Sequence, residues 1–350
     1  MRGDFRAMMN MICGWLIALA AAAFSAFVFH APLRIVYFMT HIDQCFKWLI
    51  AFLGLRGDKW IHNDQRGENR MNPVILYADG LPVELKSFHD LSFLGGYGRV
   101  FRVFDQMISG TLAFGIQNDK GRYFLKYAGA PVVNYLGNPD DAIDRLKNAA
   151  YLYETLSHPL LPNLADKAET EHGFLLVFPW IDGYPLGPLT DNYQQMRKLP
   201  VSDRLRMLDS FFSFHVLVSL NDYIAAGLTD NHLTIDYGDN TLYLNSIDDY
   251  AKMPVMNVRG RLPGSPWYLA PECYHTAASL DERVTIYAMG AAALTFLGNR
   301  QNPALSSWES SPALFHITMK ALAEDPQRRF PSTEAFLTAW RQGIFDTPFI

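Results

Sequence analysis

The stretch that decides the fold spans residues 223–250 and reads YIAAGLTDNHLTIDYGDNTLYLNSIDDY. Within it, two short apolar runs at 233–235 and 242–244 flank a Gly-Asp-Asn turn, and this pattern predicts a β-hairpin. Asp230 stands just before the first run and Asp248 stands just after the second. Because a hairpin brings its outer ends side by side, we expect these two carboxylates to converge on one ligand.

The composition of the chain restricts its class. Its 350 residues, of which 49% are hydrophobic, can form one large domain or two modest ones with a substantial core. A net charge of −5 argues against nucleic acid as the main partner, because phosphate binding needs a basic surface. Cys13, Cys45 and Cys273 are too widely spaced for a zinc pattern or a disulfide framework, so we expect reduced structural thiols.

The N-terminus carries an apolar segment, residues 8–29, without any ionisable side chain. As a helix it would extend about 33 Å, which is enough to cross the hydrocarbon core of a bilayer. We therefore predict that residues 1–34 form a retained membrane anchor that contacts the membrane through residues 8–29. A cleaved signal peptide is one alternative, since Arg2 and Arg6 supply a basic start, but the segment exceeds the usual signal core of about 7–15 residues. A buried helix is another.

Residues 35–56 form a different kind of segment. Asp43 and Lys47 would each cost about 2.5–3.5 kcal/mol at the centre of a bilayer, but their i,i+4 spacing lets them pair on one helix face. The opposite face is apolar, so we predict an amphipathic helix in the membrane interface or on a partner, with a second membrane span as the alternative. Residues 57–80 are polar and rich in turn formers, and we predict a linker there.

Two candidate phosphate contacts follow the predicted linker. Residues 91–104, LSFLGGYGRVFRVF, place glycines between two apolar runs, which predicts a β-hairpin whose bare backbone can approach phosphate through Gly95, Gly96 and Gly98. A second predicted hairpin places Lys126 at the end of an apolar strand. Each signal is weak alone, because any tight hairpin can contain such glycines and a strand-end lysine usually reaches solvent.

The order of the elements after this lysine adds context. A helix is predicted at 139–156, a His158–Pro159 corner follows, and an apolar strand runs into the Trp-Ile-Asp-Gly sequence at 180–183. Together with the glycine-rich stretch, this series resembles the small lobe and hinge of protein kinases, and more narrowly a bacterial serine/threonine-kinase-like group. The resemblance implies an α+β bilobal protein-kinase-like fold, with a β-rich N-lobe at 81–180 and a mainly helical C-lobe at 181–345, preceded by the N-terminal membrane segment.

The C-terminal half strengthens the resemblance. Residues 264–272, GSPWYLAPE, are similar to the end of a kinase activation segment. The resemblance implies that Glu272 pairs with Arg329, and this pair is structural in kinases. It therefore implies that the fold is kept, without implying that phosphate is transferred.

The resemblance also implies roles at a nucleotide site. The residues that would contact ATP are Gly95, Gly96, Gly98, Lys126 and Trp180. Asp248 would hold Mg²⁺ as the remaining carboxylate of the sequence Ser246-Ile247-Asp248, and the site is weakened because Ser246 replaces a second carboxylate. Asp230 could act as a displaced catalytic base.

Several positions that carry chemistry in kinases are altered in this chain. The altered positions are the proton-accepting aspartate (Gly227), the metal-binding asparagine (His232), the helix glutamate (Ala149), the aspartate that braces the catalytic loop (Thr285) and the first loop glycine (Phe93). Glu154 is an imperfect substitute for the helix glutamate. Because such groups act as a unit in phosphoryl transfer, their joint loss should impair it strongly.

A kept scaffold with altered chemistry predicts a membrane-anchored pseudokinase that regulates or scaffolds a partner protein, with ATP and Mg²⁺ binding still open. A divergent active serine/threonine-type kinase that uses Asp230 and Asp248 is the first alternative. A kinase for a small molecule or a lipid head group is the second. The resemblance implies a single-pass protein of the inner membrane with its kinase-like domain in the cytoplasm.

Overall fold

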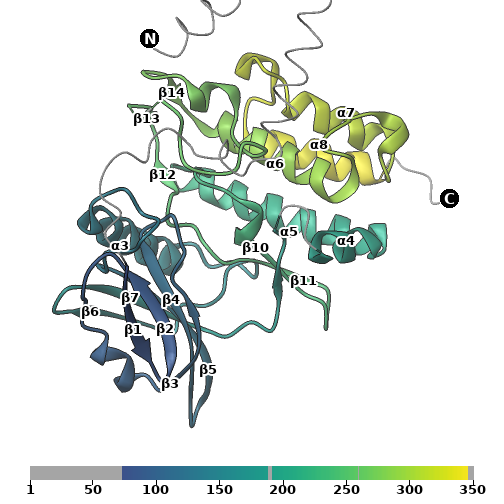
Figure 1. Cartoon of the computed structure of the whole chain (residues 1–350). Coiled ribbons are helices and arrows are strands. Elements are labelled where there is room, and N and C mark those ends of the chain that lie inside the picture. The colour runs from purple at the N-terminus through teal and green to yellow at the C-terminus, as the bar shows by residue number, and fades with distance from the viewer. Residues whose placement is uncertain (1–72, 188–190, 259, 346–350) are drawn as a thin grey trace, which may run out of the picture. The chain divides into compact units, whose positions relative to one another are not determined.

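The computed structural model describes residues 73–345, apart from 188–190 and 259 (Figure 1). The chain divides into two compact units, and all described residues belong to the second, Asn72–Ile350. The membrane anchor predicted at 1–34 and the amphipathic helix predicted at 35–56 lie outside the described residues. Among the helices that are described, none combines the length and the apolar content needed to span a bilayer.

The N-lobe is built on a five-stranded antiparallel sheet with the order β3-β4-β5-β7-β6. Its strands are β3 (Arg99–Phe104), β4 (Thr111–Asn118), β5 (Gly121–Ala128), β6 (Asp166–Thr170) and β7 (Gly173–Pro179). Side chains alternate between the two faces of a strand, so Phe124 and Lys126 lie on one face of β5 while Leu125 and Tyr127 lie on the other. The face of Leu125 and Tyr127 is covered by a short hairpin, and the face of Lys126 is turned toward helix α3 and the C-lobe.

The covering hairpin corrects the predicted linker at 57–80. Its strands are β1 (Val74–Ala78) and β2 (Leu81–Leu85), so the last part of that linker belongs to the N-lobe. Asp79 and Gly80 form the turn with positive φ angles of 49° and 84°, a conformation that favours aspartate and glycine. The alternation of buried Val83 and Leu85 with Glu84 and Lys86 was a readable strand signal.

The hairpin predicted for residues 91–104 is wrong in its first half. Ser92–Gly96 forms a 3₁₀ helix, η1, and only β3 is a strand. The Asp90 carboxylate accepts hydrogen bonds from the N–H and the hydroxyl of Ser92, which starts a turn at this point, and Leu94 is buried by that turn. Leu94 is therefore buried by a helical turn and not by the strand that was predicted here.

Helix α3 (Pro139–Thr155) packs on the inner face of the sheet, where the sequence predicted a helix. The Asn138 side chain caps its first turn by accepting a hydrogen bond from the Asp140 N–H, and acidic residues near the N-terminus favour the helix dipole. Leu146 and Ala149 are fully buried in the core between helix and sheet.

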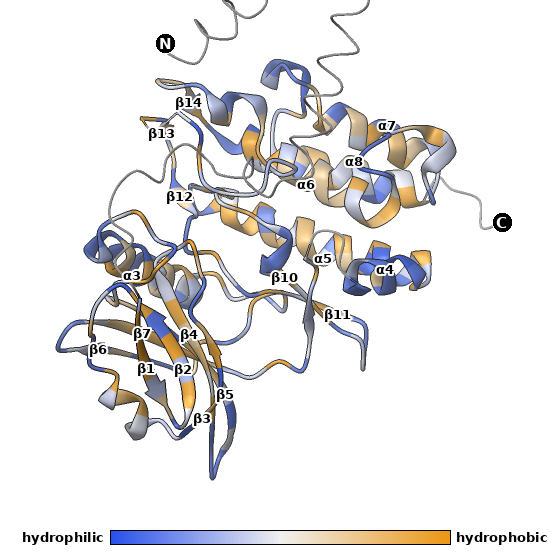
Figure 2. Cartoon of the chain, viewed as in Figure 1, coloured by the Kyte–Doolittle hydropathy of each residue, from blue (hydrophilic) through white to orange (hydrophobic). Residues whose placement is uncertain are grey.

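The C-lobe is mainly helical, as Figure 1 shows. Its helices are α4 (Asp191–Lys198), α5 (Val201–Leu220), α6 (Glu282–Leu297), α7 (Pro312–Ala321) and α8 (Thr333–Phe345). Figure 2 shows hydrophobic residues along much of α5 and α6, and nearly every residue of α6 is buried. The short helices η2 (Asp230–His232), η3 (Pro271–Tyr274), η4 (Leu305–Ser307) and η5 (Pro326–Arg328) lie in the connections.

Short strands complete the C-lobe. They are β8 (Tyr184–Pro185), β9 (Tyr223–Ile224), β10 (Leu233–Asp236), β11 (Thr241–Leu244), β12 (Ala251–Lys252), β13 (Val255–Met256) and β14 (Ser279–Leu280). The β10–β11 pair is the predicted hairpin, and its antiparallel register places Leu233 opposite Leu244. The hairpin therefore brings residues on both of its outer sides into one region.

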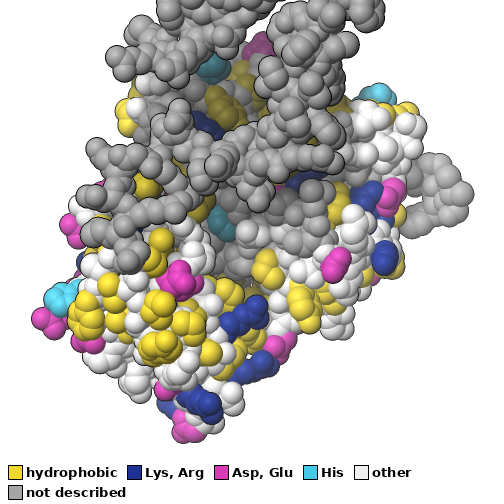
Figure 3. All heavy atoms as spheres, in the orientation of Figure 1, with side chains coloured by type: hydrophobic (Ala, Val, Ile, Leu, Met, Phe, Trp, Pro, Cys, Tyr) yellow, Lys and Arg dark blue, Asp and Glu magenta, His cyan; other side chains and the backbone are white. Residues whose placement is uncertain are grey.

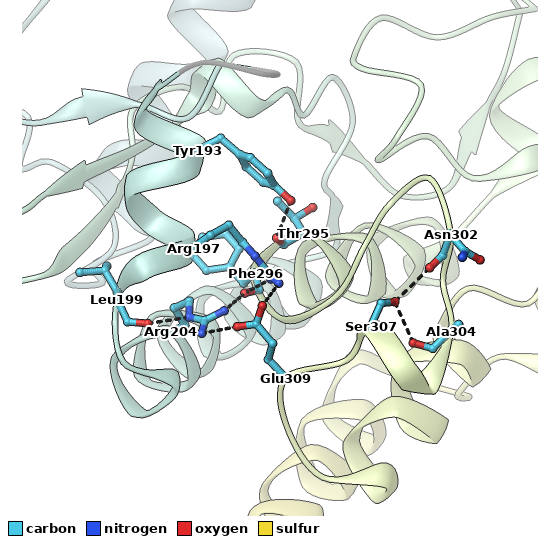
Figure 4. A network of polar contacts seen from close by, with 10 residues as sticks. All are labelled: Tyr193, Arg197, Leu199, Arg204, Thr295, Phe296, Asn302, Ala304, Ser307 and Glu309. Atoms are coloured by element: carbon cyan, nitrogen blue, oxygen red, sulfur yellow. Dashed lines mark hydrogen bonds and ion pairs between the residues drawn. The ribbon is translucent and has the colours of Figure 1, made fainter.

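Two arginines cap the C-terminal end of α6 (Figure 4). Arg197 from α4 and Arg204 from α5 each donate a 2.7 Å hydrogen bond to the carbonyl of Phe296, and both are ion-paired with Glu309. Cations favour the C-terminal end of a helix, where the last carbonyl groups have no partner within the helix. This network fixes α4 and α5 against α6.

Candidate nucleotide site

Lys126 is the centre of the candidate site. It lies on β5 and is only 2% exposed. Its Nζ lies 2.5 Å from Asp248 Oδ2 and donates a 3.0 Å hydrogen bond to Ser246 Oγ. The structure thus brings together the strand lysine and the carboxylate predicted to hold a metal, as an ion pair closed to solvent.

The β10–β11 hairpin positions Asp248 for this contact. The Leu244 N–H at the end of β11 donates to the Leu160 carbonyl, which ties the hairpin to the segment after α3. Ile247 is fully buried in the main core. On either side of Ile247, Ser246 and Asp248 both contact the Lys126 ammonium group.

Asp230, the predicted displaced base, is already engaged. Both of its carboxylate oxygens accept hydrogen bonds from the Arg300 guanidinium, and Oδ1 also accepts a 3.0 Å bond from the Tyr268 hydroxyl. Burial raises the pKa of Tyr268, so this hydroxyl stays protonated and donates. With both of its oxygens occupied by these donors, the Asp230 carboxylate is not positioned to accept a hydrogen bond from a substrate hydroxyl.

His232 lies at the position of the metal-binding asparagine. The pKa of His232 is lowered to about 4, mainly by burial and also by the positive charge of Lys126, while the charges of Asp248 and Asp230 oppose this shift. The two carboxylates are held by different partners, Asp230 by Arg300 and Asp248 by Lys126, so their predicted convergence on one ligand stays a prediction. The imidazole is neutral at neutral pH.

The residues offer little to a magnesium ion. Within the described part of the chain, no group of three or more His, Cys, Asp or Glu side chains is arranged to hold a metal. Asp248 Oδ1 is buried and accepts no hydrogen bond from a described residue, but Oδ2 is held by Lys126. Mg²⁺ needs octahedral oxygen ligands and usually binds one or two carboxylates together with phosphates. As arranged, the residues do not fit a magnesium nucleotide.

No helix glutamate reaches Lys126 among the described residues. Ala149 is fully buried on α3 and offers no charge. Glu154, the predicted imperfect substitute, pairs instead with Lys167 on β6 at 2.7 Å. Asp248 therefore supplies the counter-charge that the helix provides in kinases.

Aromatic side chains occupy the sheet face between Lys126 and the hinge. Phe124 stands two residues before the lysine, where the kinase motif Val-Ala-Ile-Lys has alanine. The Trp180 ring lies 6.4 Å from the ring of Phe124 and 4.9 Å from that of Phe101. A Cβ at Gly115, opposite Phe124, would meet the Phe101 and Trp180 rings at 2.7–3.0 Å. The hinge tryptophan predicted to contact ATP is thus packed against aromatic side chains of the chain itself.

The glycines predicted to contact phosphate lie elsewhere. A Cβ at Gly98 would lie 2.6 Å from the Gln117 carbonyl oxygen, and the Asn118 side chain donates to the Tyr97 carbonyl. These contacts place the glycine-rich stretch at the β4–β5 turn, about 17 Å along β5 from Lys126 at the usual rise per residue. Gly95, Gly96 and Gly98, predicted to contact phosphate, therefore lie away from Lys126.

The turn between β3 and β4, residues 105–110, is the hairpin loop that precedes the lysine strand. It contains a single glycine, Gly110, where an added Cβ would meet the Tyr135 ring at 2.6 Å. Arg145 from α3 donates a 2.6 Å hydrogen bond to the Ser109 carbonyl, and its Nε lies 3.6 Å from Asp249 Oδ1. Arg145 thereby links this loop to the residue beside Asp248.

Two structural features of the resemblance are present. Arg329 donates hydrogen bonds of 2.6 and 2.9 Å to the two carboxylate oxygens of Glu272, as predicted. Thr285 Oγ1 accepts a 3.0 Å hydrogen bond from the Ala225 N–H, so a hydroxyl braces the segment after β9 where the resemblance places a carboxylate. The scaffold is kept where it supports the fold.

These features define an α+β bilobal protein-kinase-like fold. Comparison with known proteins found no matching family model and no matching curated protein. Among solved structures, the crystal structure of the Mycobacterium tuberculosis PknI kinase domain is similar, with 19% sequence identity and a TM-score of 0.49 over 71% of this chain and 96% of that one. A double mutant of that domain gives 18% identity and a TM-score of 0.47 over 71% and 95%.

Phe124, Arg145 and Arg300 were not among the residues predicted for this site. Phe124 was readable, because its position relative to Lys126 is fixed by the lysine motif. Arg145 and Arg300 carried no local signal, since each acts on residues far away in the chain.

Proposed function

We propose that this protein is a membrane-anchored pseudokinase whose kinase-like domain regulates or scaffolds a partner protein instead of transferring phosphate. The observation that carries the proposal is the buried ion pair between Lys126 and Asp248. The lysine that would bind phosphate and the carboxylate that would bind metal neutralise each other.

The chemistry of phosphoryl transfer supports this proposal. Kinases need the strand lysine paired with a helix glutamate and a separate aspartate on the metal. Here Asp248 is held by the lysine, Ala149 replaces the glutamate, and Gly227 stands at the base position. Loss of a general base alone costs typically about 10²–10⁴-fold in rate. Because the residues do not fit the magnesium nucleotide, no transfer step follows from their arrangement.

The divergent-kinase alternative would use Asp230 as base. That role requires Arg300 and Tyr268 to release a carboxylate that they hold with several hydrogen bonds. No observation among the described residues favours such a release, so the pseudokinase remains the better proposal.

A thermal-shift titration of the full-length chain with ATP, with and without Mg²⁺, tests the proposal. We expect no Mg²⁺-dependent rise in melting temperature at millimolar ATP. Lys126→Met removes the candidate phosphate contact, and Lys167→Met, in an exposed ion pair with Glu154, is the matched control. A Mg²⁺-dependent shift that disappears in Lys126→Met and persists in Lys167→Met would overturn the proposal.

The membrane part of the proposal rests on the apolar segment at 8–29. We expect the full-length protein to stay with the membrane fraction after carbonate extraction and to lose this association when residues 8–29 are deleted. Protein in the soluble fraction in both cases would contradict a retained anchor.

A further inference from the structure

Strand β1 is an edge strand within the described part of the chain. It pairs on one side with β2, and among the described residues no backbone hydrogen bond reaches its other side. An edge strand presents a row of N–H and C=O groups that can pair with another strand. Proteins usually protect such an edge with lysine, proline, a bulge or a covering element.

The backbone groups on this edge belong to Ile75 and Tyr77. In the β1–β2 register, Tyr77 stands opposite Pro82, which has no N–H, and Ile75 stands opposite Glu84, whose N–H donates to Asp105 instead. Pairs in an antiparallel ladder alternate between hydrogen-bonded and non-hydrogen-bonded positions. The N–H and C=O groups of Ile75 and Tyr77 therefore point away from β2.

The side chains of the same two residues are exposed. Ile75 is 51% exposed and Tyr77 is 71% exposed. The strand sequence, VILYA, contains no charge and no proline, so none of the common protective residues is present. Figure 3 shows hydrophobic side chains gathered on the N-lobe face turned to the viewer, where β1 and β2 lie in Figure 1.

We propose that β1 is a homodimer interface, in which it pairs antiparallel with β1 of a second copy about a two-fold axis at Leu76. This register places Ile75 of one copy opposite Tyr77 of the other. In each of these two pairs the residues form N–H···O=C hydrogen bonds in both directions, and the two hairpins become one four-stranded sheet.

The sequence of β1 favours a second copy of the chain as the strand that pairs with its edge. A strand that meets itself antiparallel needs a sequence that is complementary under reversal, and VILYA provides this by placing a β-branched side chain opposite an aromatic one. No like charges meet, because the strand has none. In this antiparallel pairing the N-terminal ends of the two β1 strands lie at opposite ends of the joined sheet.

The dimer should be weak and reversible. A five-residue strand pair buries less surface than the roughly 1,200–2,000 Å² of stable protein interfaces. We therefore expect association that depends on protein concentration, and a larger dimer fraction wherever copies are held together on one surface.

Sedimentation velocity of the full-length chain over a range of concentrations tests the interface. Tyr77→Lys places a charge on the edge and should weaken self-association by about tenfold or more. Phe88→Lys is the matched control, because Phe88 is similarly exposed on the N-lobe but lies outside β1, and it should leave association unchanged. Ile75→Pro removes an N–H that β2 does not use and should act like Tyr77→Lys.

Cysteine cross-linking tests the register. Leu76 would face its own copy as a non-hydrogen-bonded pair with Cα atoms about 4.5 Å apart, which permits a disulfide. Leu76→Cys should therefore cross-link under mild oxidation, as mapped by peptide mass spectrometry, whereas Tyr77→Cys should not. Monomer at every concentration, equal association of Tyr77→Lys, or cross-linking at 77 alone would overturn the proposal. Loss of vesicle binding in Tyr77→Lys without any change in association would assign the face to the membrane instead.

Discussion

Replacing Asp248 with asparagine should destabilise the folded domain. The Lys126 and Asp248 side chains are only 2% and 4% exposed, so the substitution leaves a buried ammonium group without its counter-charge. Breaking one partner out of a buried ion pair typically costs about 3–5 kcal/mol. For a domain of this size, that cost corresponds to a fall in melting temperature of about 6–20 °C. The introduced amide still accepts a hydrogen bond, which favours the lower end of both ranges.

A double substitution distinguishes the net contribution of the ion pair to stability from the cost of leaving one buried charge unpaired. Lys126→Met with Asp248→Leu replaces both charges with apolar side chains, and such replacements of a buried pair are often neutral. The double variant should therefore be more stable than Asp248→Asn alone. Urea denaturation followed by circular dichroism compares the wild type, Asp248→Asn, the double variant and its two single variants, Lys126→Met and Asp248→Leu. Lys147→Met is the control, because its pair with Glu169 is exposed. The reasoning is refuted if Asp248→Asn lies within about 0.5 kcal/mol of the wild type, or if the effects of the two positions simply add.

Three further predictions concern the scaffold. Glu272→Gln should destabilise the domain by about 3 kcal/mol in urea denaturation, because the Arg329 side chain is fully buried; a change below about 0.5 kcal/mol would contradict a structural pair. Thr285→Val should cost about 1–3 kcal/mol by leaving the Ala225 N–H unpaired, while Thr285→Ser should retain most of that stability; equal losses would assign the effect to packing. Burial lowers the pKa of His215 to about 4, below its unfolded value near 6.5. The contribution of this histidine to the free energy of unfolding is therefore fully present above pH 6.5 and is lost as the pH falls toward 4. Urea denaturation between pH 6.5 and 4 should show the free energy of unfolding fall by about 3 kcal/mol, and His215→Gln should make this fall smaller; the same dependence on pH in the variant would contradict the assignment to His215.

Much of the scaffold was predictable because its signals are local. The β10–β11 hairpin follows from two apolar runs around a Gly-Asp-Asn turn, and α3 lies where a helix was predicted at 139–156. The pairing of Glu272 with Arg329 was predicted from the resemblance alone, and the structure confirms it.

The candidate site was only partly predictable. The glycine-rich stretch looked like a phosphate loop because three glycines follow an apolar run, but the turn started by Asp90 and the burial of Leu94 make it a 3₁₀ helix. The capture of Asp230 by Arg300 joins residues 70 positions apart, and no sequence periodicity reports such a contact. The ion pair between Lys126 and Asp248 likewise depends on tertiary packing, which decides which carboxylate lies nearest to the lysine.

Transfer of labelled γ-phosphate from ATP measures most directly whether the site is closed by its own ion pair. The full-length wild type and Asp248→Asn are incubated with Mg²⁺ and with a general protein substrate, and incorporation into both proteins is followed over hours. If Lys126 and Asp248 close the site, the wild type should incorporate no more labelled phosphate than the Asp248→Asn variant does. Wild-type incorporation that disappears in Asp248→Asn or in Asp230→Asn would contradict the pseudokinase.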